Sequence, residues 1–326
     1  MPKHQPKERL QKMLRKVTDW LAYVVVRCVI CAIQSVSLET CDRVCSILAA
    51  IIDRTPLRRN VIDPNVRLVF GALEPRMATA LRIAMWRNLL LMICEISHAP
   101  RKIHRTNWRE HFYIRDKDIG LQLMMDARPT VLVTGHFGNF ELAGFVNGLF
   151  GLPSTTIARP LDNPQVNKFI TEFRSLGGQH MLPKDGSSAA VQDILAQAGT
   201  LALLADQHAG AKGCWVDFFG HPTSCHKALA LFVLSSKAPM AVSYNRRLRH
   251  PLRFELGVTG VADPLVPSKQ LESVKDLTRW YNLKLEEAIR LAPEQYWWLH
   301  RRWREEPARK TKAKPLEETK QQNSAA

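Results

Sequence analysis

The sequence predicts an α/β fold with a mostly parallel central sheet flanked by helices. The first observation is a short β-branched run at residues 130–134, which a helix-compatible stretch at 139–149 follows directly. The second is that the alternation continues, with strands expected at 155–158 and 200–205 and a polar helix at 164–176 between them. Strands that alternate with helices form parallel sheets covered on both faces. In such sheets, chemistry gathers beyond the carboxyl ends of the strands.

The first segment, residues 1–40, predicts a membrane-associating helix. Residues 1–16 carry six Lys and Arg against the single acid Glu8, and an apolar run at 20–33 follows, interrupted by Arg27. That run is shorter than the roughly 20 residues of a comfortable membrane span. It fits a marginal span, an interfacial helix or a buried helix of the soluble domain. We expect membrane attachment, because the basic flank would meet anionic headgroups.

A catalytic domain is expected over residues 41–304, and a disordered tail over 305–326, where Lys and Arg give way to Gln, Asn, Ser and Ala. Within the domain, apolar residues recur at helical spacing over 64–98, and Gly71 and Pro75 predict a break between two core-facing helices.

Composition narrows the function classes. The chain has 326 residues, 46% of them hydrophobic, and a net charge of +16, which excludes a disordered, collagen-like or disulfide-stapled chain. The basic surplus indicates an anionic partner: nucleic acid, an anionic membrane or an acidic carrier or substrate.

The seven cysteines are scattered, and no signal peptide is recognisable before them. We therefore expect reduced thiols on the cytoplasmic side. Cys28 and Cys31, and then Cys41 and Cys45, have spacings that suggest a metal site. Both pairs lie in apolar helical sequence without turn residues, so we interpret them as helix-packing thiols and predict no metal site.

The candidate catalytic motif stands where the strand at 130–134 ends. It reads Gly-His-Phe-Gly-Asn-Phe-Glu over residues 135–141. His136 would lie on the strand-to-helix turn, and Glu141 about one helical turn later, where its carboxylate could orient the imidazole. The glycines would leave helix N-terminal N–H groups free to face an oxyanion. A merely structural histidine is the alternative.

This motif resembles the His-x4-Asp/Glu motif of glycerolipid acyltransferases, in the version found in the lipid A biosynthesis lauroyl/myristoyl acyltransferases. Further blocks resemble that family in order over about residues 55–304. They are Ile157-Ala-Arg159-Pro160 with Asn163-Pro164, then Arg174 with Gly177-Gly178, Asp206-Gln207, the glycine-aromatic loop from Gly213 to Thr223, and the terminal signature from Pro293 to Trp303. Phe140 and Tyr296 stand where the family often has Trp, and Cys225-His226 departs from its usual loop.

The resemblance implies transfer of a fatty acyl chain from acyl carrier protein, or from coenzyme A, to a hydroxyl of a lipid A precursor or related glycolipid. It places the protein at the cytoplasmic face of the inner membrane and implies no metal or redox cofactor. His136 would be the general base, oriented by Glu141. The implied substrate-binding residues are Arg159, Asn163, Arg174, Asp206, Gln207, Phe219 and Gly220.

Each of these sites has a plainer alternative. Arg159 would hold a phosphate or developing charge, or be a surface arginine at a turn. Asp206 would position substrate or His136, or cap a turn. Phe219, with Trp215 and Phe218, would line an acyl-chain groove or belong to the core.

Two arginine clusters bear on the partners. The terminal block at 297–304 could stack on bases, but we expect it to dock on the core while its arginines face phosphates. The arginines at 246, 247, 249 and 253 flank a predicted hairpin after the strand at 240–244, and we expect them to form a basic patch for an acidic carrier.

Two other functions compete. A thioesterase or lipid hydrolase would use water in place of the acceptor hydroxyl, although the chain has no Gly-x-Ser-x-Gly elbow. A non-catalytic basic membrane-binding or nucleic-acid-binding protein would explain the charge but not the polar residues at the strand ends. The P-loop, dinucleotide and zinc-protease motifs are also absent. We therefore expect lipid and carrier partners rather than nucleic acid.

Overall fold

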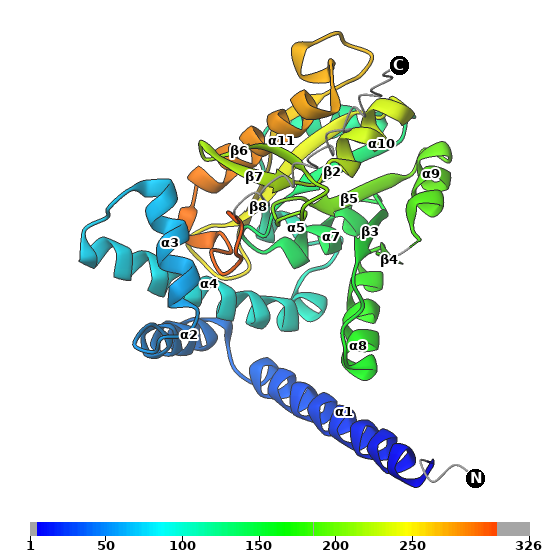
Figure 1. Ribbon diagram of the computed structural model, residues 1–326. Helices are drawn as coiled ribbons and strands as arrows, with labels where there is room; N and C mark the ends of the chain where they lie inside the picture. The colour runs from blue at the N-terminus through cyan, green and yellow to red at the C-terminus, as the bar shows by residue number, and fades with distance from the viewer. Residues whose placement is uncertain (1–4, 185, 305–326) are drawn as a thin grey trace, which may run out of the picture.

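The computed structural model describes residues 5–184 and 186–304, and the expected tail at 305–326 lies outside them. It confirms the α/β prediction: helices cover both faces of a seven-stranded sheet, and an apolar helix precedes them (Figure 1). The strand order is β1-β9-β8-β2-β5-β3-β4. The pair β8–β9 is antiparallel, and the other neighbouring pairs of this sheet are parallel. The strands are β1 (Phe112–Ile114), β2 (Thr130–Thr134), β3 (Ser154–Ala158), β4 (Gln179–Pro183), β5 (Thr200–Leu204), β8 (Met240–Arg247) and β9 (Phe254–Ala262).

Strand β2 sits in the middle of the sheet, and its two faces differ. Val131 and Val133 are fully buried in the main core, where they meet α9 (Ser188–Ala196), α10 (Ala228–Ser236) and α11 (Val274–Arg290). Thr130, Leu132 and Thr134 point to the other face because strand side chains alternate. β2 therefore carries a packed face and a second face with polar ends.

The other helices lie on both sides of the sheet or precede it in the chain. α7 (Phe140–Leu149) and α8 (Pro164–Leu176) start within a residue of their predicted positions, and α7 packs against β3, β4 and β8. The predicted helical block is α3 (Arg59–Phe70) and α4 (Pro75–Lys102), separated at Gly71 as expected. The short helices are α5 (Trp108–His111), α6 (Lys117–Met125), η1 (Lys269–Leu271) and η2 (Pro293–Gln295).

A two-stranded hairpin lies outside the sheet. β6 (Cys214–Phe218) and β7 (His221–Cys225) pair antiparallel, and Phe219 and Gly220 form the two-residue turn between them. Both turn residues have positive φ, +53° and +74°, as a type I′ turn requires. The left-handed conformation of Phe219 is held by burial of its ring and by a hydrogen bond from its N–H to Glu286 Oε1 (2.7 Å).

Helix α1 (Gln5–Gln34) projects from the body, and α2 (Leu38–Asp53) follows it after a short turn (Figure 1). Leu10–Gln34 is long and apolar enough to cross a membrane, and none of its most apolar window is buried. α4 meets the same criteria of length and composition. It is a core helix of the body, because Met85 and Leu91 are fully buried.

The interpretation of the cysteines as helix-packing thiols is confirmed for Cys41 and Cys45 and is wrong for Cys28 and Cys31. Cys41, Cys45 and Cys94 cluster between α2 and α4, while Cys28 and Cys31 are exposed on α1. Among residues 5–184 and 186–304, no three His, Cys, Asp or Glu side chains are arranged to hold a metal ion.

Candidate active site

The turn after β2 brings His136 against Asp206 at the end of β5. The imidazole Nδ1 lies 2.7 Å from Asp206 Oδ1, and the backbone N–H of His136 donates to Asp206 Oδ2 at 2.8 Å. β2 and β5 are adjacent parallel strands in register, so residues that follow their carboxyl ends meet at one edge of the sheet. Asp206 is 2% exposed, and water does not compete for its carboxylate.

The electrostatics of the pair favour charge separation. Burial of the His136 imidazole works to lower its pKa, but the charge of Asp206, their hydrogen bond and the charge of Glu141 raise the pKa above its ordinary value. Burial of Asp206 works to raise the pKa of its carboxyl, yet the charge and hydrogen bonds of His136 and the charge of Arg302 lower it. The carboxylate is therefore ionised and ready to stabilise an imidazolium.

Two glycines permit this close packing. A Cβ on Gly135 would lie 3.2 Å from Asp206 Oδ2, and a Cβ on Gly138 would lie 1.8 Å from the carbonyl oxygen of Asn245. Gly138 also has a φ of +61°, which L side chains rarely adopt. The glycines of the motif thus let the histidine turn approach both neighbouring strands.

The remaining surroundings define the protonation state of the ring. Since a carboxylate only accepts, Nδ1–H donates to Asp206. Nε2 faces the side-chain nitrogen of Gln207, which as an amide NH₂ only donates, so Nε2 accepts with its lone pair. The side-chain amide of Gln207 lies 3.3 Å from Nε2. The rings of Phe140 and Trp297 meet the imidazole edge-on, with centroids 4.9 Å and 5.3 Å away. A neutral imidazole held in this way can take a proton from a hydroxyl that displaces Gln207.

Glu141 does not make the hydrogen bond expected of it. Its carboxylate pairs with Arg174, at 2.6 Å from Nη2 and 3.0 Å from Nε, and the hydrogen bond to the His136 ring comes from Asp206 instead. Glu141 acts on the imidazole only through its charge. Its position in the first turn of α7 directs it toward α8, which carries Arg174.

The expectation of free N–H groups at the turn is wrong for residues 137–139. The N–H of Phe137 donates to Gly135 O, that of Gly138 to Gln295 O and that of Asn139 to Asn245 O. The turn lies between β8 and residues 293–304, which we call the terminal segment. Both supply carbonyl acceptors for the N–H groups of the turn.

Two other predicted residues lie outside the His136 cluster. Arg159 follows β3, and its side chain is 79% exposed and pairs with the exposed Asp162. Asn163 caps α8 by accepting from the N–H groups of the next turn, and its Nδ2 donates to Asp19 O on α1 at 2.8 Å. Asn163 thus joins α8 to the N-terminal helix.

The glycine-aromatic loop belongs to the core. Phe219 contacts the Trp298 ring, Phe218 stacks with Trp303, and Trp215 meets His208. Gly220 is exposed at the tip of the hairpin. Of the two alternatives, an acyl-chain groove or the core, these contacts place Phe218 and Phe219 in the core.

Half of the expected basic patch is internally paired. Arg247 is buried against the fully buried Glu95, and Arg246 pairs with Glu255. Arg249 and Arg253 remain exposed. The patch prediction is therefore wrong for Arg246 and Arg247, since the alternation of β8 and its pairing with β9 bring both arginines to acidic partners.

The terminal segment completes the histidine turn, which sequence reasoning missed. The N–H of Trp297 donates to His136 O, and Phe137 and Tyr296 form an isolated antiparallel bridge. Asn65 of α3 holds this segment by donating to the carbonyls of Trp298 and His300. No spacing rule relates positions 160 residues apart, although the density of aromatic residues in the terminal block could have suggested a buried role.

A cavity of about 360 Å³ begins next to the motif. Thr130, Leu132 and Thr134 of β2 line it along the strand, and Ala143 and Asn147 of α7 form a facing wall. Its other lining residues come from β1, β5, α6, β8 and β9 and from the loops before α6 and after α7. The apolar ones include Leu121, Leu123, Phe150, Leu152, Tyr244, Leu256 and Val258, and the charged ones are Arg115, Asp116, Lys117 and Asp118. The cavity is largely apolar and starts two residues before His136.

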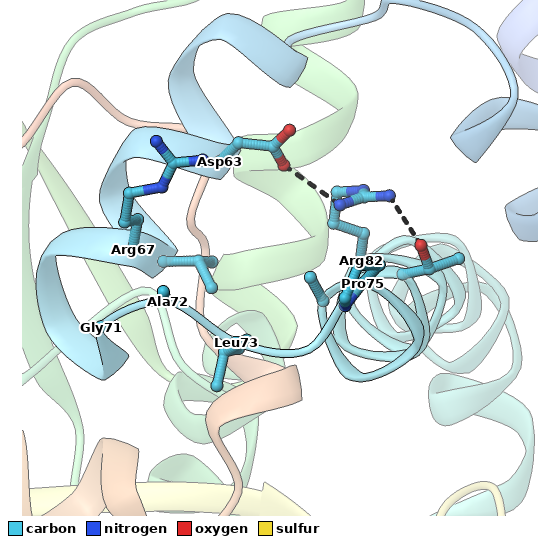
Figure 2. A pocket seen from close by; sticks show the side chains of 10 residues that line it. Asp63, Arg67, Gly71, Ala72, Leu73, Pro75 and Arg82 are labelled. Atoms are coloured by element: carbon cyan, nitrogen blue, oxygen red, sulfur yellow. Dashed lines mark hydrogen bonds and ion pairs between the residues drawn. The ribbon is translucent and has the colours of Figure 1, made fainter.

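A second cavity, of about 440 Å³, lies between α3 and α4 (Figure 2). Arg82 spans it, with Nη1 3.2 Å from Asp63 Oδ1 and a hydrogen bond to Thr79. The Arg82 guanidinium also pairs with Asp53. Its charge is balanced by these carboxylates, and none of the residues lining this cavity belongs to the His136 cluster.

Sequence comparison identifies the family of the chain. Residues 5–305 match the family model described as bacterial lipid A biosynthesis acyltransferase. The chain is 23% identical to a lipid A biosynthesis lauroyltransferase of Escherichia coli, over 77% of this chain and 80% of that protein. It is 26% identical to a lipid A biosynthesis palmitoleoyltransferase of E. coli, over 61% and 63%.

A phosphatidylinositol mannoside acyltransferase of Mycolicibacterium smegmatis is 31% identical over 36% of this chain, and the aligned part spans 44% of that protein. The family model, in contrast, covers nearly all of the residues that build the fold and the histidine turn. The chain therefore belongs to the bacterial lipid A biosynthesis acyltransferase family.

Proposed function

We propose that this protein transfers a fatty acyl chain from a thioester of acyl carrier protein or coenzyme A to a hydroxyl of a lipid A precursor or related glycolipid. The observation that carries the proposal is the His136–Asp206 pair at the sheet edge, beside an apolar cavity. Family membership supports the reaction class and a lipid acceptor.

In the proposed reaction, His136 Nε2 takes the proton of the acceptor hydroxyl while the oxygen attacks the thioester carbonyl. Asp206 accepts from Nδ1–H and stabilises the imidazolium. The tetrahedral intermediate collapses by breaking the carbon–sulfur bond, and the imidazolium returns the proton to the leaving thiolate. The thioester already supplies an activated acyl group, so the step needs no metal or redox cofactor.

The cavity suits the acyl chain. Aliphatic and aromatic side chains dominate its lining, and burial of each methylene contributes about 0.8 kcal/mol. Along β2, Thr130 to Thr134 spans about 13 Å. A chain bound along β2 would bring its carbonyl carbon toward the His136 end of the strand.

Arg159 and Gln207 retain proposed substrate roles. Gln207 lies 3.3 Å from the nitrogen that would accept the proton, so the acceptor hydroxyl would take its place. Arg159 is exposed beyond β3, where only an exposed aspartate pairs with it, and it can reorient toward a phosphate on the acceptor.

We further propose that α1 and α2 hold the protein on the cytoplasmic face of the inner membrane. α1 leaves its apolar window unburied. On α2, an aliphatic stripe with i, i+3, i+4, i+7 spacing is between 42% and 62% exposed, and it consists of Val44, Ile47, Leu48 and Ile51. Arg54 and Arg58, also exposed, lie at the end of this stripe, where anionic headgroups would balance them.

Acyl transfer by the purified full-length protein tests the function. Radiolabelled acyl thioester and a lipid A precursor are supplied in mixed micelles, and the product is identified by mass spectrometry. His136→Ala should lower kcat by about 10²- to 10⁴-fold, the usual contribution of a general base. His250→Ala, an exposed histidine in the β8–β9 loop, is the matched control.

Two outcomes contradict the proposal. Equal turnover by His136→Ala would remove His136 as the base. Thioester hydrolysis that does not give way to transfer when acceptor is added would indicate a thioesterase.

A further inference from the structure

Arg302 is a buried cation whose hydrogen-bond acceptors are all neutral. It is 1% exposed. Nη1 donates to the carbonyl oxygens of Gln207 (2.7 Å) and Ser224 (2.9 Å), and Nη2 donates to Asn282 Oδ1 and Cys225 Sγ, both at 3.0 Å. An isolated charge without a counter-charge is costly to bury, so a balancing anion is expected nearby.

Asp206 is that anion. It immediately precedes Gln207, whose carbonyl Arg302 holds, and it is 2% exposed. The charge of Arg302 contributes to lowering the pKa of the Asp206 carboxyl, after the opposing effect of burial and the larger effects of His136. The positive charge of Arg302 therefore stabilises the carboxylate of Asp206, and the hydrogen bond to the Gln207 carbonyl holds Arg302 next to it in the chain fold.

The same segment is fixed from a second side. The N–H of His208 donates to His300 Nε2 at 3.0 Å. His300 must then keep a lone pair on Nε2, and burial lowers the pKa of its imidazole to about 4. Residues 206–208 are thus held by Arg302 and His300, both of the terminal segment.

We propose that Arg302 is a positioning residue of the acyl-transfer site, which fixes the backbone of residues 206–208 and keeps Asp206 ionised for its hydrogen bond to His136. This inference rests on the proposed function. Arg302 acts on His136 only through Asp206.

Several groups affect the pKa of these two residues. His136 faces Asp206 from the β2–α7 turn, and Glu141 influences the imidazole from α7. Tyr296 and His300 of the terminal segment, and His226 after β7, also interact with Asp206. All are retained in the variants below.

The test compares pH–rate profiles of kcat/KM for full-length variants. Arg302→Gln leaves the charge of Asp206 unbalanced, so Asp206 binds its own proton and holds the imidazolium of His136 more tightly, and the pKa values of both groups rise. The acidic limb of the profile should move to higher pH, and kcat should fall by up to about 10²-fold as the segment loses its anchor. Arg302→Lys keeps the charge but not the fork of hydrogen bonds, so it should lower kcat while the limb stays in place.

Arg279→Gln is the matched control, since Arg279 is an exposed arginine on α11 and loses the same charge. It should leave the limb and kcat unchanged. An acidic limb in Arg302→Gln that coincides with wild type would overturn the electrostatic part of the proposal, and unchanged kcat in Arg302→Lys would overturn the backbone part.

If Arg302→Gln does not fold, Asn282→Asp replaces it. This change puts a carboxylate where Nη2 now contacts an amide oxygen at 3.0 Å. The guanidinium keeps its position, and the new carboxylate balances its charge. The limb should again move to higher pH, and an unmoved limb would contradict the proposal.

NMR titration of the His136 ring separates this inference from the proposed function. A higher His136 pKa in Arg302→Gln than in wild type would support the role of Arg302 even if no acyl transfer is found. Failure of transfer in wild type would count only against the proposed function.

Discussion

His136 donates two hydrogen bonds to one residue at the end of the neighbouring strand. Asp206 contacts both its ring and its backbone N–H, and this fixes the imidazole relative to the turn that carries it. Glu141, the carboxylate nearer in sequence, is engaged with Arg174. The two carboxylates should therefore contribute very differently to activity.

We expect Asp206→Asn to lower kcat by about 10²-fold or more, because the imidazolium loses its counter-charge. His136 acts as a base only when neutral, so activity falls as the pH drops through its pKa. Asp206 raises that pKa; its loss should therefore move the acidic limb of the pH–rate profile to lower pH. The profile of kcat against pH measures both effects.

Glu141→Gln is the comparison variant. Its ion pair with Arg174 is about one-fifth exposed, and its loss should reduce kcat by less than about tenfold. An equal loss in both variants would instead make Glu141 a second essential carboxylate.

At the scale of elements, the size of the cavity between β2 and α7 should limit the length of the acyl chain that the protein binds. Ala143 faces it from α7. We expect Ala143→Leu to shorten the chain that the protein transfers most efficiently, because the larger side chain occupies part of the cavity. Competition among donors with chains of 8 to about 16 carbons, read by product mass, measures this preference; chain burial scales with each methylene.

The control for this variant is Ala189→Leu, at an exposed alanine on α9. It adds the same side chain away from the cavity and should leave the preference unchanged. Unaltered chain selection by Ala143→Leu would place the acyl chain elsewhere.

Local pattern was sufficient for the central elements of the fold. β2 has its predicted bounds, and α8 matches residue for residue, because each has a strong periodicity and clear end signals such as the Asn163-Pro164 cap. The edge strands β1 and β4 were not predicted. β1 has three residues, and β4 includes Pro183 and has little buried surface.

The candidate site could likewise be predicted only in part from local sequence. The strand-end positions of His136 and Asp206 could be predicted from the sequence, whereas their pairing depends on which strands are neighbours, which periodicity does not specify. Asn163 and Phe219 were matched to a family pattern, but their side chains serve a helix cap and a hairpin turn. A pattern of residues does not by itself distinguish a substrate contact from a structural one.

At the scale of the whole molecule, α1 and α2 lie together on one side of the body (Figure 1). We expect the full-length protein to float with vesicles of phosphatidylethanolamine and phosphatidylglycerol. Ile47→Glu puts a charge in the exposed stripe of α2 and should weaken vesicle binding by roughly tenfold, since it replaces an aliphatic side chain that would be buried in the bilayer on binding.

Leu176→Glu, at a residue 73% exposed on α8, is the matched control for vesicle binding. Equal binding by both variants would show that α1 alone attaches the protein.

The hydrogen bonds between the terminal segment and the histidine turn also have a consequence for biosynthesis. Trp297 and Gln295 bind the turn at His136 and Gly138, and they are synthesised about 160 residues after it. A nascent chain from which α1 and the motif have already emerged still lacks these contacts. Because domains complete their folding as the chain emerges from the ribosome, the protein should gain activity only after Gln295 and Trp297 have been released from the ribosome.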